Sequence, residues 1–267
     1  MTARHRTSKE PPRRLVLWNI DLTLVDVGRV TRAAYVDAFR RVTGRPLVLF
    51  PQTAGSSESE IFFEAVELNA VGLGIDGPGG DGSGGDGGGR DGSGEALLAR
   101  FIQELATAFA ARRGQLTSQG RLLPGALEAV AAVGRLPGVV QSVLTGSIAP
   151  NAIEKLQAFG LAEHLDTESG GYGSDVFPKG AMLLNARRRA AEKYSATFSE
   201  DATVYIADSP RDMEAARVGG ARCVAVATGR SSAGELRDAG ADIILPDLAD
   251  TAAVVWAVDE LTVAFRP

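Results

Sequence analysis

Short apolar segments rich in β-branched residues recur along the chain, and most of them are followed by a helical pattern. These segments are Arg14–Trp18, Val139–Leu144, Thr203–Ala207, Arg222–Ala227 and Asp242–Leu245. Such runs are typical of strands that are buried on both faces of a parallel sheet. The repeated order of strand, helix and strand predicts a doubly wound α/β fold, in which ligands bind at the carboxyl ends of the strands.

The interval between the first strand and Val139 does not follow this alternation. It is about 120 residues long, and helical signals dominate it, for example in Ala33–Val42 and Ala96–Ala111. A single crossover between parallel strands needs far fewer residues. We therefore expect a helical cap domain over residues 27–121, inserted into an α/β core that comprises residues 14–26 and 122–267.

Glycine is concentrated in one part of this interval. Of the 32 glycines in the chain, 13 fall between Gly72 and Gly94, where almost no side chain is apolar. This composition predicts a flexible loop inside the cap. The run is also similar to the calcium-binding nonapeptide repeat, but that repeat needs regularly spaced large apolar residues, and residues 78–94 contain none.

The net charge of the chain argues against a function in binding nucleic acid. The formal charge is −5 and the isoelectric point is near 5.2, whereas nucleic-acid-binding domains usually present a basic face. Basic residues do gather in residues 1–13, but two prolines interrupt that segment. We expect a flexible, solvated tail there.

Cysteine usage and hydropathy indicate the compartment. No apolar stretch approaches the length that crosses a bilayer, and the start of the chain lacks the apolar segment of a secretory signal. The single cysteine, Cys223, cannot form an internal disulfide. We expect a cytoplasmic protein that binds neither membrane nor nucleic acid.

Polar residues follow the predicted strands at the edge where a ligand is expected. They are Asn19 and Asp21 after the first strand, Thr145, Gly146 and Ser147 after the second, and Asp208 and Asp212 after the third, while Lys179 precedes a helical stretch at 181–191. Hydroxyl and backbone N–H groups suit phosphate oxygens, and carboxylates suit a hard cation such as Mg²⁺. Taken alone, Asn19 and Asp21 could instead cap a helix or loop, and Asp212 could be an acidic residue at a helix N-terminus.

In this order, these residues resemble the motifs of the haloacid dehalogenase superfamily, which are Asp-x-Asp-x-Thr after the first strand, a Ser or Thr, a Lys, and a pair of acidic residues. The resemblance extends from about Arg14 to Leu248, and the predicted insert matches the helical cap of such enzymes. It implies a hydrolase that uses Mg²⁺ and a covalent aspartyl intermediate. The residues it implies are Asn19, Asp21, Thr145 and Lys179 for catalysis, Thr23, Thr145, Gly146, Ser147 and Lys179 for substrate binding, and Asn19, Asp21, Asp208 and Asp212 for the metal.

The chain departs from the family pattern at the position of the nucleophilic aspartate, where it has Asn19. A carboxamide is neutral, so it is a poor nucleophile towards phosphorus and a weaker ligand for Mg²⁺ than a carboxylate. We therefore expect aspartyl-phosphate chemistry to be very slow or absent. Attack by Asp21 in its place is disfavoured, because its different position along the backbone aims it differently.

The lysine of the motif set is assigned with alternatives. Lys179 lies between a proline and a glycine, whereas relatives more often have a proline after the lysine. Lys155 and Lys193 are the nearby alternatives, and we interpret both as solvated charges on helix faces. Lys179 is therefore the lysine predicted to face a phosphate.

Three functions remain compatible with the sequence. The first is a phosphatase-type hydrolase of a small phosphomonoester, with weak or absent activity because of Asn19. The second is a non-catalytic relative that binds a phosphorylated metabolite or a protein partner. The third, cleavage of carbon–halogen or carbon–phosphorus bonds, is the least supported. Carbon–halogen cleavage needs the missing carboxylate. Carbon–phosphorus cleavage in this superfamily uses a lysine of the cap, and residues 27–121 contain no lysine. The oligomeric state is not indicated.

Overall fold

The structure is a computed structural model that describes residues 13–69, 92–175 and 178–262. The predicted basic tail, apart from Arg13, lies outside these residues, as does the predicted glycine-rich loop from 72 to 91. The prediction is wrong for the last part of this loop, because residues 92–94 form the start of a helix. The helix that carries the apolar face of residues 97–109 extends backwards to include them.

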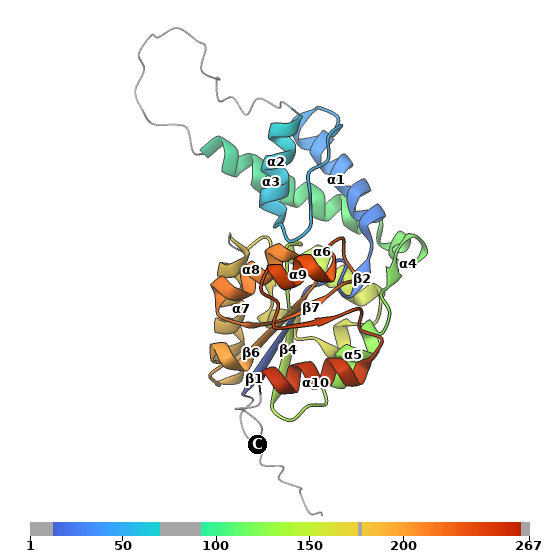
Figure 1. The fold of residues 1–267 in the computed structure, drawn as a ribbon. Coiled ribbons are helices and arrows are strands. Elements are labelled where there is room, and N and C mark those ends of the chain that lie inside the picture. Colours follow the sequence, from blue (N-terminus) through green and yellow to red (C-terminus); the bar gives the residue numbers. More distant parts are fainter. Residues whose placement is uncertain (1–12, 70–91, 176–177, 263–267) are drawn as a thin grey trace, which may run out of the picture.

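A six-stranded parallel sheet forms the centre of the larger part of the molecule (Figure 1). The order is β5-β4-β1-β6-β7-β8, with β1 at Arg14–Trp18, β4 at Val139–Thr145, β5 at Gly171–Tyr172, β6 at Thr203–Ala207, β7 at Arg222–Val226 and β8 at Ile243–Leu245. β1 lies between β4 and β6 and is buried along its whole length. The doubly wound α/β fold is confirmed, and each predicted strand occurs to within one residue at either end.

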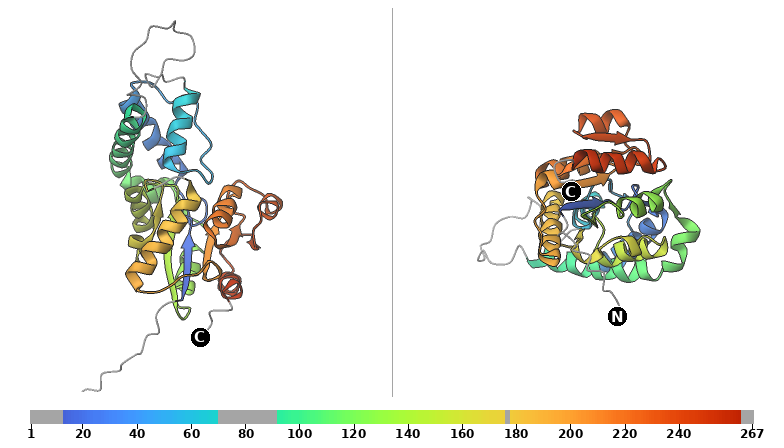
Figure 2. Two further views of the ribbon diagram at one scale, coloured as in Figure 1. Left: turned by 90° about the vertical axis from the view of Figure 1, so that its left-hand side faces the viewer. Right: turned by 90° about the horizontal axis from the view of Figure 1, so that it is seen from below.

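Helices cover both faces of this sheet (Figure 2). One face packs against α5 (Ala126–Val133), α6 (Ala149–Ala158) and α10 (Thr251–Leu261), and the other packs against α7 (Lys179–Tyr194), α8 (Pro210–Gly219) and α9 (Ala233–Asp238). Side chains of β1 alternate between the two cores, with Val16 and Trp18 in the first and Leu15 and Leu17 in the second. In the part of the chain that the structure describes, no helix is both long enough and apolar enough to span a membrane.

Three helices stand beyond the carboxyl ends of the strands, apart from the sheet (Figures 1 and 2). They are α1 (Gly28–Thr43), α2 (Glu58–Leu68) and α3 (Gly92–Ala110), and we call them the helix group. α1 packs along α3, and aromatic rings join the three helices: the centroids of Phe62 and Phe101 are 4.4 Å apart, and those of Tyr35 and Phe101 are 5.5 Å apart. Apolar packing therefore holds the three helices together, in a core that is continuous with that on one face of the sheet.

The chain passes from the sheet to the helix group and back at one place. β2 (Val25–Asp26) pairs antiparallel with β3 (Arg121–Leu122), and Arg121 Nη2 lies 3.2 Å from Asp26 Oδ2. The return passage also holds α4 (Leu116–Gln119) and the short 3₁₀ helix η1 (Arg113–Gln115), while η2 (Ala162–His164), η3 (Thr167–Ser169) and η4 (Glu200–Ala202) lie in loops of the α/β part. The two passages lie side by side, as the two ends of an inserted unit must.

Candidate active site

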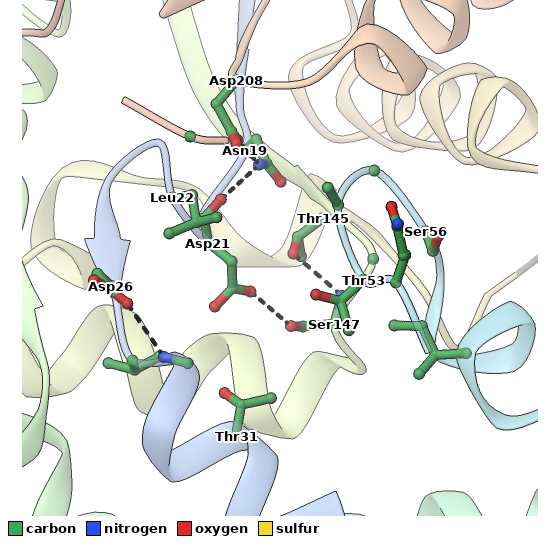
Figure 3. Close-up of a pocket in the computed structure, with 18 of the residues that line it drawn as sticks. Asn19, Asp21, Leu22, Asp26, Thr31, Thr53, Ser56, Thr145, Ser147 and Asp208 are labelled. Carbon is green, nitrogen blue, oxygen red and sulfur yellow. Dashed lines mark hydrogen bonds between the residues drawn. The ribbon is translucent and has the colours of Figure 1, made fainter. Parts of the chain in front are cut away.

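A pocket of about 700 Å³ lies between the carboxyl ends of the strands and the helix group (Figure 3). Of the residues predicted for the site, those that line this pocket are Asn19, Asp21, Thr145, Gly146, Ser147, Lys179 and Asp208. Thr23 and Asp212 do not line it, because both side chains are fully enclosed behind the pocket floor. The structure therefore brings together residues that are up to 189 positions apart in the chain.

Asn19 follows β1 and points its side-chain nitrogen at three oxygens. Nδ2 lies 2.9 Å from Asp208 Oδ1, 3.0 Å from the backbone carbonyl oxygen of Asp21 and 3.3 Å from Thr23 Oγ1. A carboxylate and a carbonyl only accept hydrogen bonds, so the nitrogen and not the oxygen of the carboxamide must face them. The orientation of Asn19 is thus fixed by its surroundings.

The loop after β1 has an unusual backbone conformation. Leu22 has a φ of 60°, in the left-handed region, which costs a residue other than glycine roughly 1–2 kcal/mol. Its carbonyl oxygen accepts a hydrogen bond from Thr228 Oγ1 at 2.6 Å, which holds the turn against the loop after β7. The turn leaves the carbonyl of Asp21 facing Asn19.

Asp208 follows β6 and is buried. Burial, followed by the nearby charge of Asp212, raises the pKa of Asp208 to about 7. Hydrogen bonds from Thr23 and Asn19 and the charge of Lys179 act in the opposite direction. The two hydrogen bonds end on the same oxygen, since Thr23 Oγ1 also donates to Asp208 Oδ1 at 2.8 Å.

Lys179 begins α7 and lines the pocket. Its Nζ lies 2.5 Å from Oδ1 of Asp212, which also accepts a hydrogen bond from the Tyr205 hydroxyl at 2.9 Å. Ser209 Oγ donates to the other Asp212 oxygen at 2.5 Å. The family resemblance implies Asp212 as a metal ligand; in the structure its two carboxylate oxygens are engaged by Lys179, Tyr205 and Ser209.

At the other end of the pocket, Asp21 pairs with a lysine that we had not assigned to the site. Lys155 Nζ lies 2.8 and 2.6 Å from the two carboxylate oxygens of Asp21 and 2.8 Å from Ser147 Oγ. The Lys155 side chain is only 1% exposed, so its interpretation as a solvated charge is wrong. Lys193, at 39% exposure, does lie on a helix surface, where it pairs with Asp166 and Glu168.

The sequence does contain a signal for Lys155. The buried face of α6 comprises Asn151, Ala152, Lys155 and Leu156. A face drawn through Ile153, Leu156 and Phe159 leaves Lys155 out, but Ile153 is only half-buried. A face drawn through Ala152 and Leu156 includes Lys155, because residues three and four apart share one side of a helix.

The helix group contacts the pocket floor at Gly146. The N–H of Glu58 donates to the Gly146 carbonyl oxygen at 3.0 Å, and a Cβ at position 146 would lie 1.9 Å from the backbone oxygen of Ser56. Only glycine permits this approach. The Ser56 hydroxyl accepts a hydrogen bond from Arg211, which lies in the first turn of α8. The backbone before α2 is therefore held directly over the loop after β4.

Glu58 is a further site residue that the sequence did not indicate. It lines the pocket and is buried, and burial raises its pKa to about 8. The charge of Asp21 raises this pKa as well, whereas the charge of Lys155 and a hydrogen bond from the Ile148 backbone lower it. At neutral pH, Glu58 is therefore predominantly a neutral acid beside the Asp21–Lys155 pair.

The wall opposite the sheet comes from α1. The hydroxyl oxygens of Thr31 and Tyr35 are buried without a hydrogen-bond partner among the described residues, and both residues line the pocket. Arg29, Arg32 and Arg230 are exposed residues that also line it. The pocket thus combines cationic groups with hydroxyl groups, a composition that suits an oxygen-rich anionic ligand.

The residues present fit Mg²⁺ poorly. The oxygens that could hold it are one from the Asp208 carboxylate, the Asp21 backbone carbonyl and the Asn19 carboxamide. Two of these oxygens are already bound by the Asn19 nitrogen. Within residues 13–69, 92–175 and 178–262, no group of three or more acidic, histidine or cysteine side chains could hold a metal ion.

The order of the strands, the helices on both sheet faces and the pocket at the strand ends define a doubly wound α/β fold with a ligand site at the carboxyl ends of its strands. A family model for haloacid dehalogenase-like hydrolases matches residues 89–217. This stretch of the chain is similar to a haloacid dehalogenase-like hydrolase domain, in agreement with the motifs in the sequence. Comparison with curated proteins gives no significant match.

Solved structures share the fold over almost the whole chain. β-Phosphoglucomutase from Clostridium difficile is 12% identical, with a TM-score of 0.64, and the match covers 95% of this chain and 98% of that one. CbbY from Rhodobacter sphaeroides, in complex with phosphate, is 20% identical, with a TM-score of 0.59 and coverage of 91% and 99%. An aspartate-to-asparagine variant of CbbY, in complex with xylulose-(1,5)bisphosphate, is 20% identical, with a TM-score of 0.60 and coverage of 89% and 96%. At these identities the likeness shows the fold alone.

Proposed function

We propose that this protein is a phosphatase-type member of the haloacid dehalogenase superfamily that binds a small phosphomonoester and hydrolyses it very slowly or not at all. The observation that carries the proposal is the orientation of Asn19, which turns the nitrogen of a neutral side chain to the carboxylate of Asp208. An amide so held offers no anionic oxygen to attack phosphorus.

The rest of the pocket supports phosphate binding. Lys179 has three N–H groups, and one of them is engaged by Asp212, so two can be donated to a phosphate. The Thr145 side chain and the backbone around Gly146 and Ser147 lie at the end of β4 and line the same pocket as this lysine. Structural neighbours that were solved with phosphate and with a sugar bisphosphate have the same fold.

Asp21 stands where the resemblance implies a proton donor and acceptor. Both of its oxygens are engaged by Lys155, and Ser147 donates to one of them at 3.1 Å. The carboxylate is thereby held at a fixed place beside the pocket. We infer that the helix group serves as the cap over this site, with the boundaries predicted at residues 27–121.

The test compares the parent protein with Asn19→Asp in the presence of Mg²⁺ on a panel of phosphomonoesters. We expect negligible turnover by the parent and an increase of several powers of ten in Asn19→Asp, by analogy with the loss that follows removal of a covalent nucleophile. The double variant Asn19→Asp/Asp21→Asn is the control for a contaminating phosphatase and should be inactive.

Two outcomes would contradict the proposal. Robust turnover by the parent that disappears in Asp21→Asn would show that another group attacks phosphorus and that the protein is an ordinary phosphatase. An absence of turnover by both the parent and Asn19→Asp would contradict a phosphatase origin of the site and favour a binding function. Calorimetry with the same phosphomonoesters would then measure that binding.

A further inference from the structure

We propose that the pocket binds a phosphate group without a divalent cation, because the amide nitrogen of Asn19 occupies the position that a cation would need. This inference rests on the proposed function in one respect, which is that the pocket binds phosphate. It goes further by replacing the metal with a side chain of the protein itself.

The geometry of the two remaining cation ligands carries the argument. A Mg²⁺ ion bound by Oδ1 of Asp208 and by the Asp21 carbonyl would need to approach each of these two oxygens to about 2.0–2.1 Å. The Asn19 nitrogen already lies between Oδ1 of Asp208 and that carbonyl, at 2.9 and 3.0 Å. The ion and the amide cannot occupy this position together.

Displacing the amide would be unfavourable. Asn19 is buried, and turning its nitrogen away would break its hydrogen bonds to Asp208, Asp21 and Thr23. A buried N–H group that loses its partner keeps its full desolvation penalty. The neutral carboxamide also supplies less Coulomb attraction for a divalent ion than the carboxylate that the family pattern has at this position.

The charge balance of the pocket removes the need for a cation. With aspartate at position 19, that carboxylate and Asp208 would both face an incoming phosphate, in addition to Asp21, whose charge Lys155 offsets, and a divalent ion would be needed to offset the first two. Here only Asp208 remains on this side, and it accepts hydrogen bonds from Asn19 and Thr23. Lys179 faces the same pocket with two N–H groups that have no hydrogen-bond partner among the described residues, and three arginines add positive charge at the pocket wall.

The experiment is titration of inorganic phosphate into the parent protein by calorimetry, once in EDTA and once with excess Mg²⁺. We expect the two dissociation constants to agree to within about twofold, and direct titration of Mg²⁺ into the parent to give no heat of binding. In Asn19→Asp, phosphate should bind at least about tenfold more tightly with Mg²⁺ than with EDTA. Thermal melting of both proteins checks that they are folded.

A second variant is expected to change phosphate affinity in opposite directions, depending on whether a cation takes part in binding. Asp208→Asn keeps an oxygen that accepts from Asn19 and Thr23 but removes a negative charge. If phosphate binds without a cation, this variant should bind phosphate as tightly as the parent or more tightly. If a cation bridges Asp208 and the phosphate, the variant should bind phosphate at least about tenfold more weakly, and that result would overturn the inference.

The remaining outcomes separate this inference from the proposed function. Phosphate binding by the parent that requires Mg²⁺ would overturn the metal-free model and leave the proposed function intact. An absence of phosphate binding by the parent in both buffers would overturn both.

Discussion

The floor of the pocket holds two lysine–aspartate pairs that are built in opposite ways. In the Lys179–Asp212 pair, the carboxylate has no exposed surface and the lysine faces the pocket. In the Lys155–Asp21 pair, the lysine is 1% exposed, whereas the carboxylate side chain is 38% exposed and faces the pocket. Each pair therefore presents one charge to a ligand and hides the charge that supports it.

This difference determines what each lysine can do. Lys179 engages one aspartate oxygen and keeps two N–H groups for a ligand. Lys155 uses its three N–H groups on two oxygens of Asp21 and on Ser147, so it has none left for a phosphate. Lys179 is thus a ligand-binding residue, and Lys155 is a positioning residue that acts through Asp21.

The largest effect on stability is expected where the hidden partner is a carboxylate. Lys179→Met would leave Asp212 as a buried carboxylate without a countercharge, and we expect a loss of about 3–5 kcal/mol in the free energy of unfolding. Urea denaturation at neutral pH measures it. The double variant Lys179→Met/Asp212→Asn should recover part of the loss, because it removes the uncompensated charge.

A loss in the double variant as large as in Lys179→Met would contradict this explanation. It would show that the stability comes from packing of the lysine side chain and not from its pairing with Asp212.

A smaller effect is expected at the other pair. Lys155→Met would leave a carboxylate that water can reach, so we expect a loss of about 1–3 kcal/mol, between the values for buried and exposed ion pairs. The matched control is Lys193→Met, where the lysine is 39% exposed and the expected loss is about 0–1 kcal/mol. Equal losses in the two variants would show that Lys155 acts as a surface charge.

The two pairs also differ in how far the sequence predicts them. Lys179, Asp208 and Asp212 stand at strand ends or helix starts, where topology alone collects the site residues of an α/β sheet. Lys155 stands inside α6, where its role depends on which face of the helix is buried. A face drawn through Ile153 instead of Ala152 places this lysine on the solvent side of the helix.

Residues of the helix group could not be predicted for a more basic reason. Glu58, Thr31 and Tyr35 reach the pocket only because the helix group stands over the sheet, and no local pattern encodes that placement. Asn19 could be predicted from the sequence in part. Its neutrality is evident from the sequence, whereas the three oxygens that face its nitrogen are known only from the folded loop.

The last substitution tests how the stability of the protein depends on pH at the end of the pocket that holds Asp21 and Lys155. Glu58 has a pKa of about 8 in the folded protein, raised first by burial, against about 4.5 for an ordinary glutamate. Between these two values the folded state holds a proton that the unfolded state has lost, so raising the pH through this window disfavours the folded state. Glu58→Gln keeps the size of the side chain and removes the titration.

We therefore expect the parent and Glu58→Gln to differ least in stability at pH 5, with the difference growing in favour of the variant towards pH 8. Urea denaturation at pH 5, 6.5 and 8 measures it, with Glu67→Gln on the exposed side of the same helix as a control that should show no such trend. Because the charge of Lys155 lowers the pKa of Glu58, Lys155→Met should steepen the decline of stability with pH, and Lys193→Met should not. A parent and a Glu58→Gln variant with parallel pH profiles would show that Glu58 does not keep its proton in the folded state, and the contrast between the two ends of the pocket would then rest on the lysines alone.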